Sequence, residues 1–255
     1  MMMFADGHTI THNLLFNWVR ETQDHGPINT WNRAAYMHVG EDGEPTNVPE
    51  WTHISHNMIM NGPTIGHTSS LFPFVDNDDG SAYFSIVGNV GLYGGGKNYL
   101  GHDKHWADNL IIFPDHWAGD PCVQIWGGPE HHFIGNECVV GMGMGAGDDS
   151  PPGTTSLPDP IGLDSGSTGG CKVDWNNASL KDQIGHVHSN TYWTQDGEWS
   201  FGCGNATSGD HRFTMEDLHA AGEAEGSTVK QAGGLTVAML EKKVRTLLKL
   251  PPKPA

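Results

Sequence analysis

A short phrase centred on an asparagine returns six times along the chain and constrains its fold more than any other feature. Each copy has an apolar residue three positions before the asparagine and another one or two positions after it. The copies are centred on Asn13, Asn57, Asn89, Asn109, Asn136 and Asn190. Self-similarity at such periods is typical of solenoids, in which each coil contacts only its neighbours.

The phrase suits the bend of a β-solenoid. Alternating apolar residues point inward from a short strand, while an asparagine at the bend tolerates left-handed backbone and can stack its amide on the next asparagine. The two shortest steps between asparagines match one coil, the step from Asn57 to Asn89 matches a coil with a loop, and the two longest match double coils. The pattern predicts an all-β fold, a right-handed parallel β-helix over residues 1–213, with a Gly/Pro/Ser-rich loop inserted near 141–170.

The pattern changes at the C-terminal end. Thr214 followed three residues later by Asp217 predicts a capped helix start. Apolar residues at helical spacing within 236–250, with basic residues towards the end, predict a second helix. We therefore expect residues 214–255 to form a helical C-terminal cap and tail that covers the last coil.

Charge and composition narrow the partners and the location. The formal net charge of −17 disfavours nucleic acid and anionic membranes, because phosphates would be repelled, and no apolar run is long enough for membrane insertion. The four cysteines permit two disulfides in three pairings, and glycosylation sequons at Asn177 and Asn205 fit a secreted chain. We expect an extracellular or cell-surface monomer. Because the repeat begins so soon after Met1, we also expect a fragment, with earlier coils and any signal peptide missing.

A second phrase recurs about half a coil after the asparagine. Asp24 follows Asn13 at the same spacing as Asp120 follows Asn109, and the stretch 159–164 has the same plan. Equal phase in a solenoid places residues in one column on one face, and parallel strands stack about 4.8 Å apart. The phrase therefore predicts a column of polar residues that can gather into one site.

Three stretches together resemble a known group of proteins. Residues 24–33 resemble the "GDHGPFNSWGR" stretch of a group of right-handed parallel β-helix proteins with the pectin-lyase-like fold. Residues 78–98 resemble its "DDGSSNY … GGxK" stretch, and 213–227 its C-terminal segment, so that the resemblance spans most of 8–230. The pattern departs at Tyr83, which an alanine precedes instead of the group's Ser-Asn pair. The resemblance implies a carbohydrate-active extracellular protein, a glycoside hydrolase or a polysaccharide lyase.

Carboxylates within these stretches are the candidates for catalysis. A glycosidase needs two carboxylates about 5–5.5 Å apart for retention of configuration and about 6.5–9.5 Å apart for inversion, and neighbouring coils supply such separations. A histidine beside them can orient a carboxylate or share the proton transfers. The predicted catalytic residues are Asp24, His25, Asp78 and Asp79, and the favoured reaction is hydrolysis of a polysaccharide or oligosaccharide.

Other residues are candidates for binding the substrate. Arg33 and Lys97 can bind acidic sugar groups, and in the alternative, elimination by a lyase, either would neutralise a uronate carboxylate. Aromatic faces such as that of Trp31 can stack on sugar rings. The predicted substrate-binding residues are Arg33, Lys97, Trp31, His102 and Asp103. A further alternative is a non-catalytic solenoid that binds carbohydrate or has a structural role at the cell surface.

The same residues also support simpler interpretations. The stretch 78–81 (Asp-Asp-Gly-Ser) is a good turn sequence, because aspartate bonds to its own backbone and glycine supplies positive φ. Asp76, Asp78 and Asp79 have the hard oxygen ligands that hold Ca²⁺, and apart from this alternative no cofactor is expected. Among 16 histidines, His186 and His188 share one strand face, but no third ligand lies at a typical spacing. A transition-metal site is therefore not expected.

Overall fold

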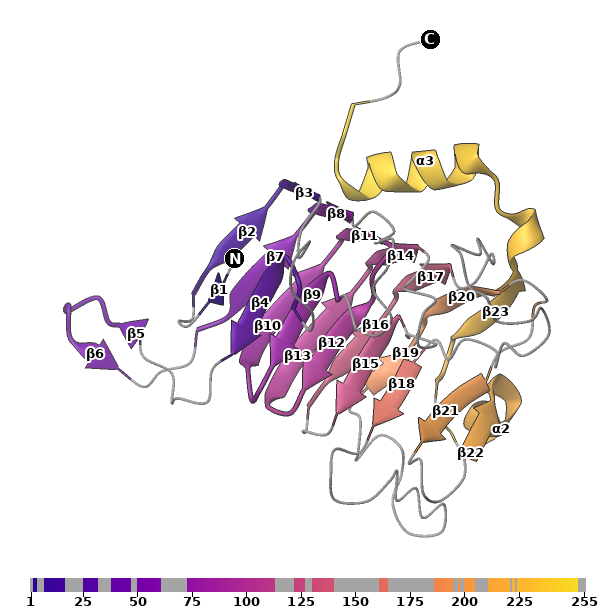
Figure 1. Cartoon of the computed structure of the whole chain (residues 1–255), viewed down its shortest axis with the longest axis horizontal. Helices are drawn as coiled ribbons and strands as arrows, with labels where there is room; N and C mark the ends of the chain where they lie inside the picture. The colour runs from indigo at the N-terminus through magenta and orange to yellow at the C-terminus, as the bar shows by residue number, and fades with distance from the viewer. Residues whose placement is uncertain are drawn as a thin grey trace.

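The computed structural model describes residues 2–3, 7–16, 25–31, 38–46, 50–60, 73–112, 122–126, 130–139, 161–164, 186–194, 197, 200–204, 211–220, 222 and 224–251. Over these residues the chain is mostly β-strand, arranged in three large sheets of largely parallel strands (Figure 1). The helices follow near the C-terminus, and the longer one lies across the strands (Figure 1). The all-β part of the expected fold is therefore confirmed.

The three sheets have the following strands. The first sheet contains β1 (Met2–Met3), β4 (Ile28–Trp31), β9 (Val75–Asp78), β12 (Gly96–Tyr99), β15 (Val123–Trp126), β18 (Ile161–Asp164), β21 (Ser200–Gly204) and β22 (His211–Thr214). The second contains β2 (Thr9–Thr11), β7 (Thr52–Ser55), β10 (Ala82–Val87), β13 (His102–Ala107), β16 (His132–Ile134) and β19 (His186–His188). The third contains β3 (Leu14–Phe16), β8 (Met58–Met60), β11 (Val90–Leu92), β14 (Leu110–Ile112), β17 (Glu137–Val139), β20 (Thr191–Thr194) and β23 (Thr228–Gln231). A separate antiparallel pair joins β5 (His38–Val39) to β6 (Pro45–Thr46).

The chain visits the second, third and first sheets in rotation, and we call one such passage a circuit. Each strand pairs in parallel with the strand at the same place one circuit later, as β7, β10 and β13 do. The register is kept from circuit to circuit, so that Ile54, Ile86 and Trp106 form one fully buried inward column. Equivalent positions of successive circuits therefore meet in columns along the stack.

The two longest steps between asparagines, from Asn13 to Asn57 and from Asn136 to Asn190, are single circuits. Strand β2 pairs directly with β7, and β16 with β19. The expectation that these two steps correspond to double coils is therefore wrong, because long insertions account for the extra length. The β5–β6 hairpin lies in the first insertion. Strand β18 lies inside the stretch 141–170 that the sequence assigned to a loop, and the rest of that stretch lies outside the described residues.

The six asparagines form a ladder of hydrogen bonds between the second and third sheets. From Asn57 onward, each Oδ1 accepts from both the backbone N–H and the side-chain amide of the asparagine one circuit earlier, at 2.8–3.3 Å. The amide also reaches an inward residue's carbonyl, as Asn109 does with Ile86. At the C-terminal end the backbone N–H of Asn190 donates to Ser227 Oγ at 3.1 Å. The predicted stacking of amides is confirmed, and it gives these buried polar groups the hydrogen-bond partners that they need.

The left-handed residue at each bend is the one before the asparagine. Positive φ values of 53–67° occur at His12, His56, Gly88, Asp108, Gly135 and Ser189. The expectation that the asparagine itself takes left-handed backbone is therefore wrong. Its side chain is needed inside the ladder, whereas the preceding position needs only a residue that accepts positive φ, so its identity varies.

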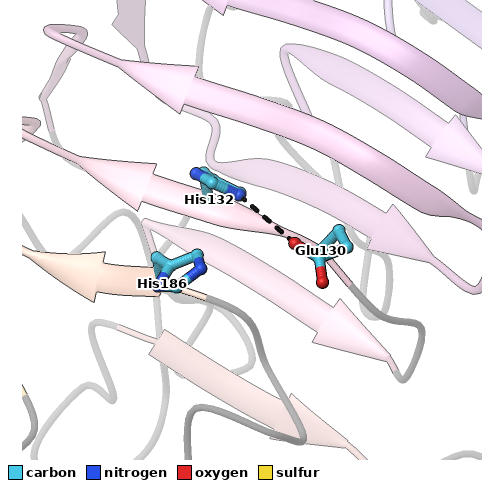
Figure 2. Close-up of side chains that lie close together, drawn as sticks. All are labelled: Glu130, His132 and His186. Atoms are coloured by element: carbon cyan, nitrogen blue, oxygen red, sulfur yellow. Dashed lines mark ion pairs between the residues drawn. The ribbon is translucent and has the colours of Figure 1, made fainter.

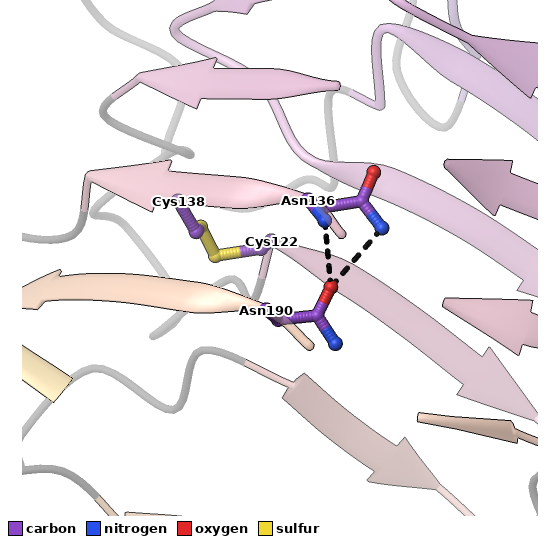
Figure 3. The surroundings of a disulfide bond; sticks show 4 residues. All are labelled: Cys122, Asn136, Cys138 and Asn190. Atoms are coloured by element: carbon purple, nitrogen blue, oxygen red, sulfur yellow. Dashed lines mark hydrogen bonds between the residues drawn. A yellow bond between two sulfur atoms is a disulfide. The ribbon is translucent and has the colours of Figure 1, made fainter. Parts of the chain in front are cut away.

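Apolar columns from all three sheets meet in one core. Trp106, Phe133 and Tyr192 are among its largest buried side chains. A disulfide between Cys122, next to β15, and Cys138 of β17 joins the first sheet to the third, and both residues are fully buried (Figure 3). Such bonds form in oxidising compartments. The other two cysteine side chains lie outside the described part of the chain.

The first of the C-terminal helices is α2 (Met215–Ala220), and it begins as the sequence predicts. Asp217 Oδ2 accepts from the backbone N–H of Thr214 at 2.8 Å, and Thr214 Oγ1 accepts from the N–H of Asp217 at 3.1 Å. The Thr214 backbone N–H and the Thr214 hydroxyl both donate to the Asp217 carboxylate at 2.8 Å, and these two bonds lower the pKa of Asp217. Leu218 is fully buried in the core cluster. This short helix therefore covers part of the core at the end formed by the last circuits.

The longer helix, α3 (Val237–Leu247), follows the 3₁₀ turn η2 (Ala232–Gly234) and is capped by Thr236. Its apolar face packs on the outer side of the third sheet, with Leu240 and Val244 in the same cluster as Leu110. Polar contacts hold it in place: Lys243 to Glu137 at 2.6 Å, and His56 Nδ1 to the Leu247 carbonyl at 2.8 Å. The helix therefore lies along several circuits rather than over the last one (Figure 1). Among the described residues, no helix is long and apolar enough to cross a membrane.

Candidate functional site

The outer face of the first sheet carries several residues that the sequence singled out. Ile28 and Val75 point into the core from β4 and β9, so the residues next to them in these strands point away from it. The register places Asn29 opposite Asp76, Asp76 opposite Lys97, and Trp31 opposite Asp78. The outward residues of three neighbouring strands are Asn29 and Trp31, Asp76 and Asp78, and Lys97 and Tyr99.

A lysine joins the two aspartates of this face. Lys97 Nζ lies 3.4 Å from Asp76 Oδ1 and 3.3 Å from Asp78 Oδ1. The two carboxylate oxygens are therefore bridged by one ammonium group, and their separation cannot exceed the sum of these two distances. The side chains of Asp76 and Lys97 are buried, whereas that of Asp78 is 22% exposed. Asp78 is therefore the member of this ion pair network that reaches solvent.

The network extends to one end of the predicted site. Asn29 Nδ2 donates to Asp76 Oδ2 at 2.9 Å and lies 2.9 Å from His25 Nδ1. His25 is exposed, so it connects the buried carboxylate to the surface through one amide. A Ca²⁺ ion bound between Asp76 and Asp78 would have to displace the Lys97 ammonium, which already lies between the two carboxylates.

Residues 78–81 form a turn at the corner between the first and second sheets. The backbone N–H of Asp79 donates to Asp78 Oδ1 at 3.0 Å, and Ser81 Oγ donates to the Asp78 carbonyl at 2.6 Å. Asp79 and Gly80 have φ values of 39° and 85°. The Gly80 N–H donates to the carbonyl of Tyr99, which ties the turn to the next circuit. The turn function proposed from the sequence is thus present, and the side chains of both aspartates are partly exposed on it.

The next circuit brings a second polar pair to this corner. His102 Nδ1 lies 2.6 Å from Asp103 Oδ2, and both side chains are about one-third exposed. The His102 ring meets Tyr83 edge-on at 5.2 Å, and Tyr83 meets Trp51 at 5.5 Å. Tyr83 and Asp103 both have positive φ, which is uncommon outside glycine and locates backbone strain at this corner.

A buried lysine that the sequence analysis overlooked lies beneath the corner. Lys104 Nζ donates to the carbonyls of Leu100, Asn77 and Tyr99 at 2.6, 3.1 and 3.4 Å. Burial lowers the pKa of Lys104 to about 7, although Asp78 and Asp76 act in the opposite direction. Its position two residues before the inward Trp106 was the available signal, because side chains alternate along a strand.

A histidine column runs along the outer face of the second sheet. His105, His132 and His186 occupy one register position on β13, β16 and β19, with ring centroids 4.1 and 4.5 Å apart. Burial lowers the pKa of His105 and of His132, and neighbouring imidazoles lower that of His132 further. The three histidines were not predicted to lie together, although the sequence contains a signal for it. The residues four positions before the ladder asparagines are Thr9, His53, Ser85, His105, His132 and His186.

The predicted site residues are therefore placed as follows. Those on the outer face of the first sheet are His25, Trp31, Asp78 and Lys97. Those at the adjoining corner are Asp79, His102 and Asp103. Asp24 and Arg33 lie outside the described residues, so the predicted pairing of Asp24 with Asp78 or Asp79 stays a prediction.

Comparisons with known proteins do not assign this chain to a family. No family model, curated protein or solved structure matches it. The similarity to pectin-lyase-like proteins therefore stays a prediction from the sequence.

Proposed function

We propose that the chain is a right-handed parallel β-helix that binds and hydrolyses a polysaccharide on the outer face of its first sheet. The rotation through three parallel sheets and the unbroken asparagine ladder support the β-helix. Right-handedness follows from the general rule that connections between parallel strands of one sheet are right-handed in about 98% of cases. The disulfide supports an extracellular location.

The observation that carries the proposed activity is the pairing of Trp31 with Asp78. Their Cα atoms are in register on adjacent strands, and Trp31 is 45% exposed. An exposed aromatic ring has a large apolar face, on which a sugar ring can stack directly beside the partly exposed carboxylate. The next strand adds Tyr99, with Lys97 Nζ 5.8 Å from its ring centroid.

In this mechanism Asp78 and Asp79 form the carboxylate pair. One protonates the glycosidic oxygen, while the other activates water or attacks the anomeric carbon. Lys97 and the buried Asp76 position Asp78, and Asn29 links the same network to His25. Lys97 is engaged by two carboxylates, which favours hydrolysis over elimination, because a lyase would need this cation for the uronate group.

A non-catalytic carbohydrate-binding solenoid is the second candidate. The hydrogen bond from the Asp79 N–H to Asp78 Oδ1 supports it, because that oxygen already has a structural partner in the turn. In this case Trp31 and the corner residues bind sugar without cleaving it.

The test is mass spectrometry of products after incubation with plant, algal and microbial polysaccharides. We expect oligosaccharides that have gained a water molecule, and we expect Asp78→Asn to reduce their formation by about 100-fold or more. The matched control is Asp108→Asn, at an exposed bend with φ of 53°, which asparagine accepts. It should leave turnover unchanged.

The other outcomes separate the alternatives. Unsaturated products without an added water molecule would show that the reaction is elimination and not hydrolysis. Absence of products from any glycan, together with binding that Trp31→Ala abolishes, would establish the binding solenoid. Equal turnover in Asp78→Asn and the control would remove Asp78 from the mechanism.

A further inference from the structure

The register of the second sheet brings together ligands that are far apart in the sequence. His132 and His186 are separated by the longest insertion between two ladder asparagines, yet they are direct partners on β16 and β19. Glu130 comes from the segment just before β16. Figure 2 shows the two imidazoles on neighbouring strands, with the Glu130 carboxylate directed towards His132. The expectation that no third ligand accompanies His186 and His188 rested on spacing along the chain. Across the strands, Glu130 and His132 lie beside His186.

The ligand atoms already lie close to one another. One nitrogen from each imidazole and a Glu130 oxygen all lie within 4.8 Å of one another, and His132 Nε2 is 3.9 Å from Glu130 Oε2. With bonds of about 2.0–2.2 Å to a tetrahedral ion, two ligand atoms are about 3.3–3.6 Å apart. Small side-chain rotations close the difference. The side chains of His132 and Glu130 are 26% and 64% exposed, so an ion can enter from solvent.

We propose that Glu130, His132 and His186 bind one divalent transition-metal ion, with water completing the coordination. Two imidazoles and one carboxylate are a ligand set that suits Zn²⁺, and imidazole also suits Ni²⁺ and Cu²⁺. Ca²⁺ and Mg²⁺ prefer oxygen ligands and are excluded by the two nitrogens. The ion would be held between neighbouring circuits of the stack.

The surroundings of this site also fit a metal. The His105 ring packs 4.1 Å from His132 on the side away from His186 and limits the rotation of that ring. The site lies on a different sheet from Asp78 and Lys97, and the proposal does not depend on the proposed hydrolysis.

The test is isothermal titration of the chelator-treated chain with ZnCl₂. We expect one ion per chain, and an affinity that His132→Ala and His186→Ala each reduce at least about 10-fold. His53→Ala is the matched control, because His53 occupies the equivalent position of an earlier circuit and is exposed. It should bind Zn²⁺ as the unaltered chain does.

Two further measurements keep the test decisive. Glu130→Gln removes the charged ligand outside the strand, so it reports on binding even if a histidine variant misfolds. Titration with Co²⁺ should give visible absorption that is lost in the same variants. Binding unaffected by all three substitutions, or the absence of stoichiometric binding, would overturn the proposal and assign any bound ion to scattered surface histidines.

Discussion

The outer columns of the first and second sheets differ in chemistry, although both arise from the same parallel pairing of strands in successive circuits. On the first sheet, Asp76 and Lys97 bring opposite charges into contact, and both are almost completely buried. On the second sheet, His105 and His132 stack like on like and stay partly exposed. A parallel stack thus aligns equivalent positions. The residue types at those positions decide whether neighbouring side chains form ion pairs with one another or leave polar atoms accessible to a ligand.

Because of this difference, substitutions on the two faces should affect stability differently. Removing one partner of a buried ion pair leaves a charge without compensation, which is costly. Changing a partly exposed imidazole removes little packing and leaves no buried charge. The first column should therefore dominate stability, and the second should matter mainly for binding.

The largest expected effect is that of Lys97→Met. It removes the ammonium that compensates the buried Asp76 carboxylate, so we expect the free energy of unfolding to fall by about 3–5 kcal/mol. Urea denaturation monitored by tryptophan fluorescence measures it. Lys242→Met, at an exposed position of α3, should change it by less than about 0.5 kcal/mol. Similar losses in both variants would show that the ion pair does not stabilise the first sheet.

An intermediate effect is expected at Lys104, which lies between the two faces. In the unfolded chain its pKa is the ordinary 10.5, whereas in the folded protein it is about 7. Between these values the unfolded state binds more protons, so this group makes stability rise with pH, by up to about 1.4 kcal/mol per pH unit. Below pH 7 the contribution is constant, because both states are protonated.

Lys104→Met tests this directly. The variant should show a flatter increase in the free energy of unfolding from pH 7 to 10 than the unaltered chain, measured by urea denaturation at each pH. Because the substitution also leaves three carbonyls without their lysine donor, the slope, not the absolute stability, is the measurement. Identical slopes would mean that Lys104 is not held in a buried, uncharged state.

The smallest effect is expected for His132→Gln without metal. Its side chain is partly exposed and carries no buried charge, so the free energy of unfolding should change by less than about 0.5 kcal/mol. Phe133→Ala, at the next residue and fully buried, should cost about 3–5 kcal/mol. A loss above about 2 kcal/mol in His132→Gln would show that the histidine column holds the stack together, and the contrast between the two faces would fail.

The sequence alone determined the features that repeat. The asparagine phrase predicted the amide ladder and the parallel strands, because a bend that recurs in every circuit requires the same side chain each time. The Thr214–Asp217 pair predicted the start of α2, because capping involves residues three positions apart. The second phrase gave the stretch 159–164 the same plan as the stretch after Asp120, and β18 of the first sheet lies within it, although the sequence also predicted a loop there.

Which residues meet across circuits became visible only in the folded protein. Insertions make the circuits very unequal in length, so distance along the chain does not measure distance along the stack. The contacts of Lys97 with Asp76, of His132 with His186, and of α3 with the third sheet all depend on the count of circuits. Register is a relation between two paired strands, so it is defined only once the chain has folded and the strands have paired.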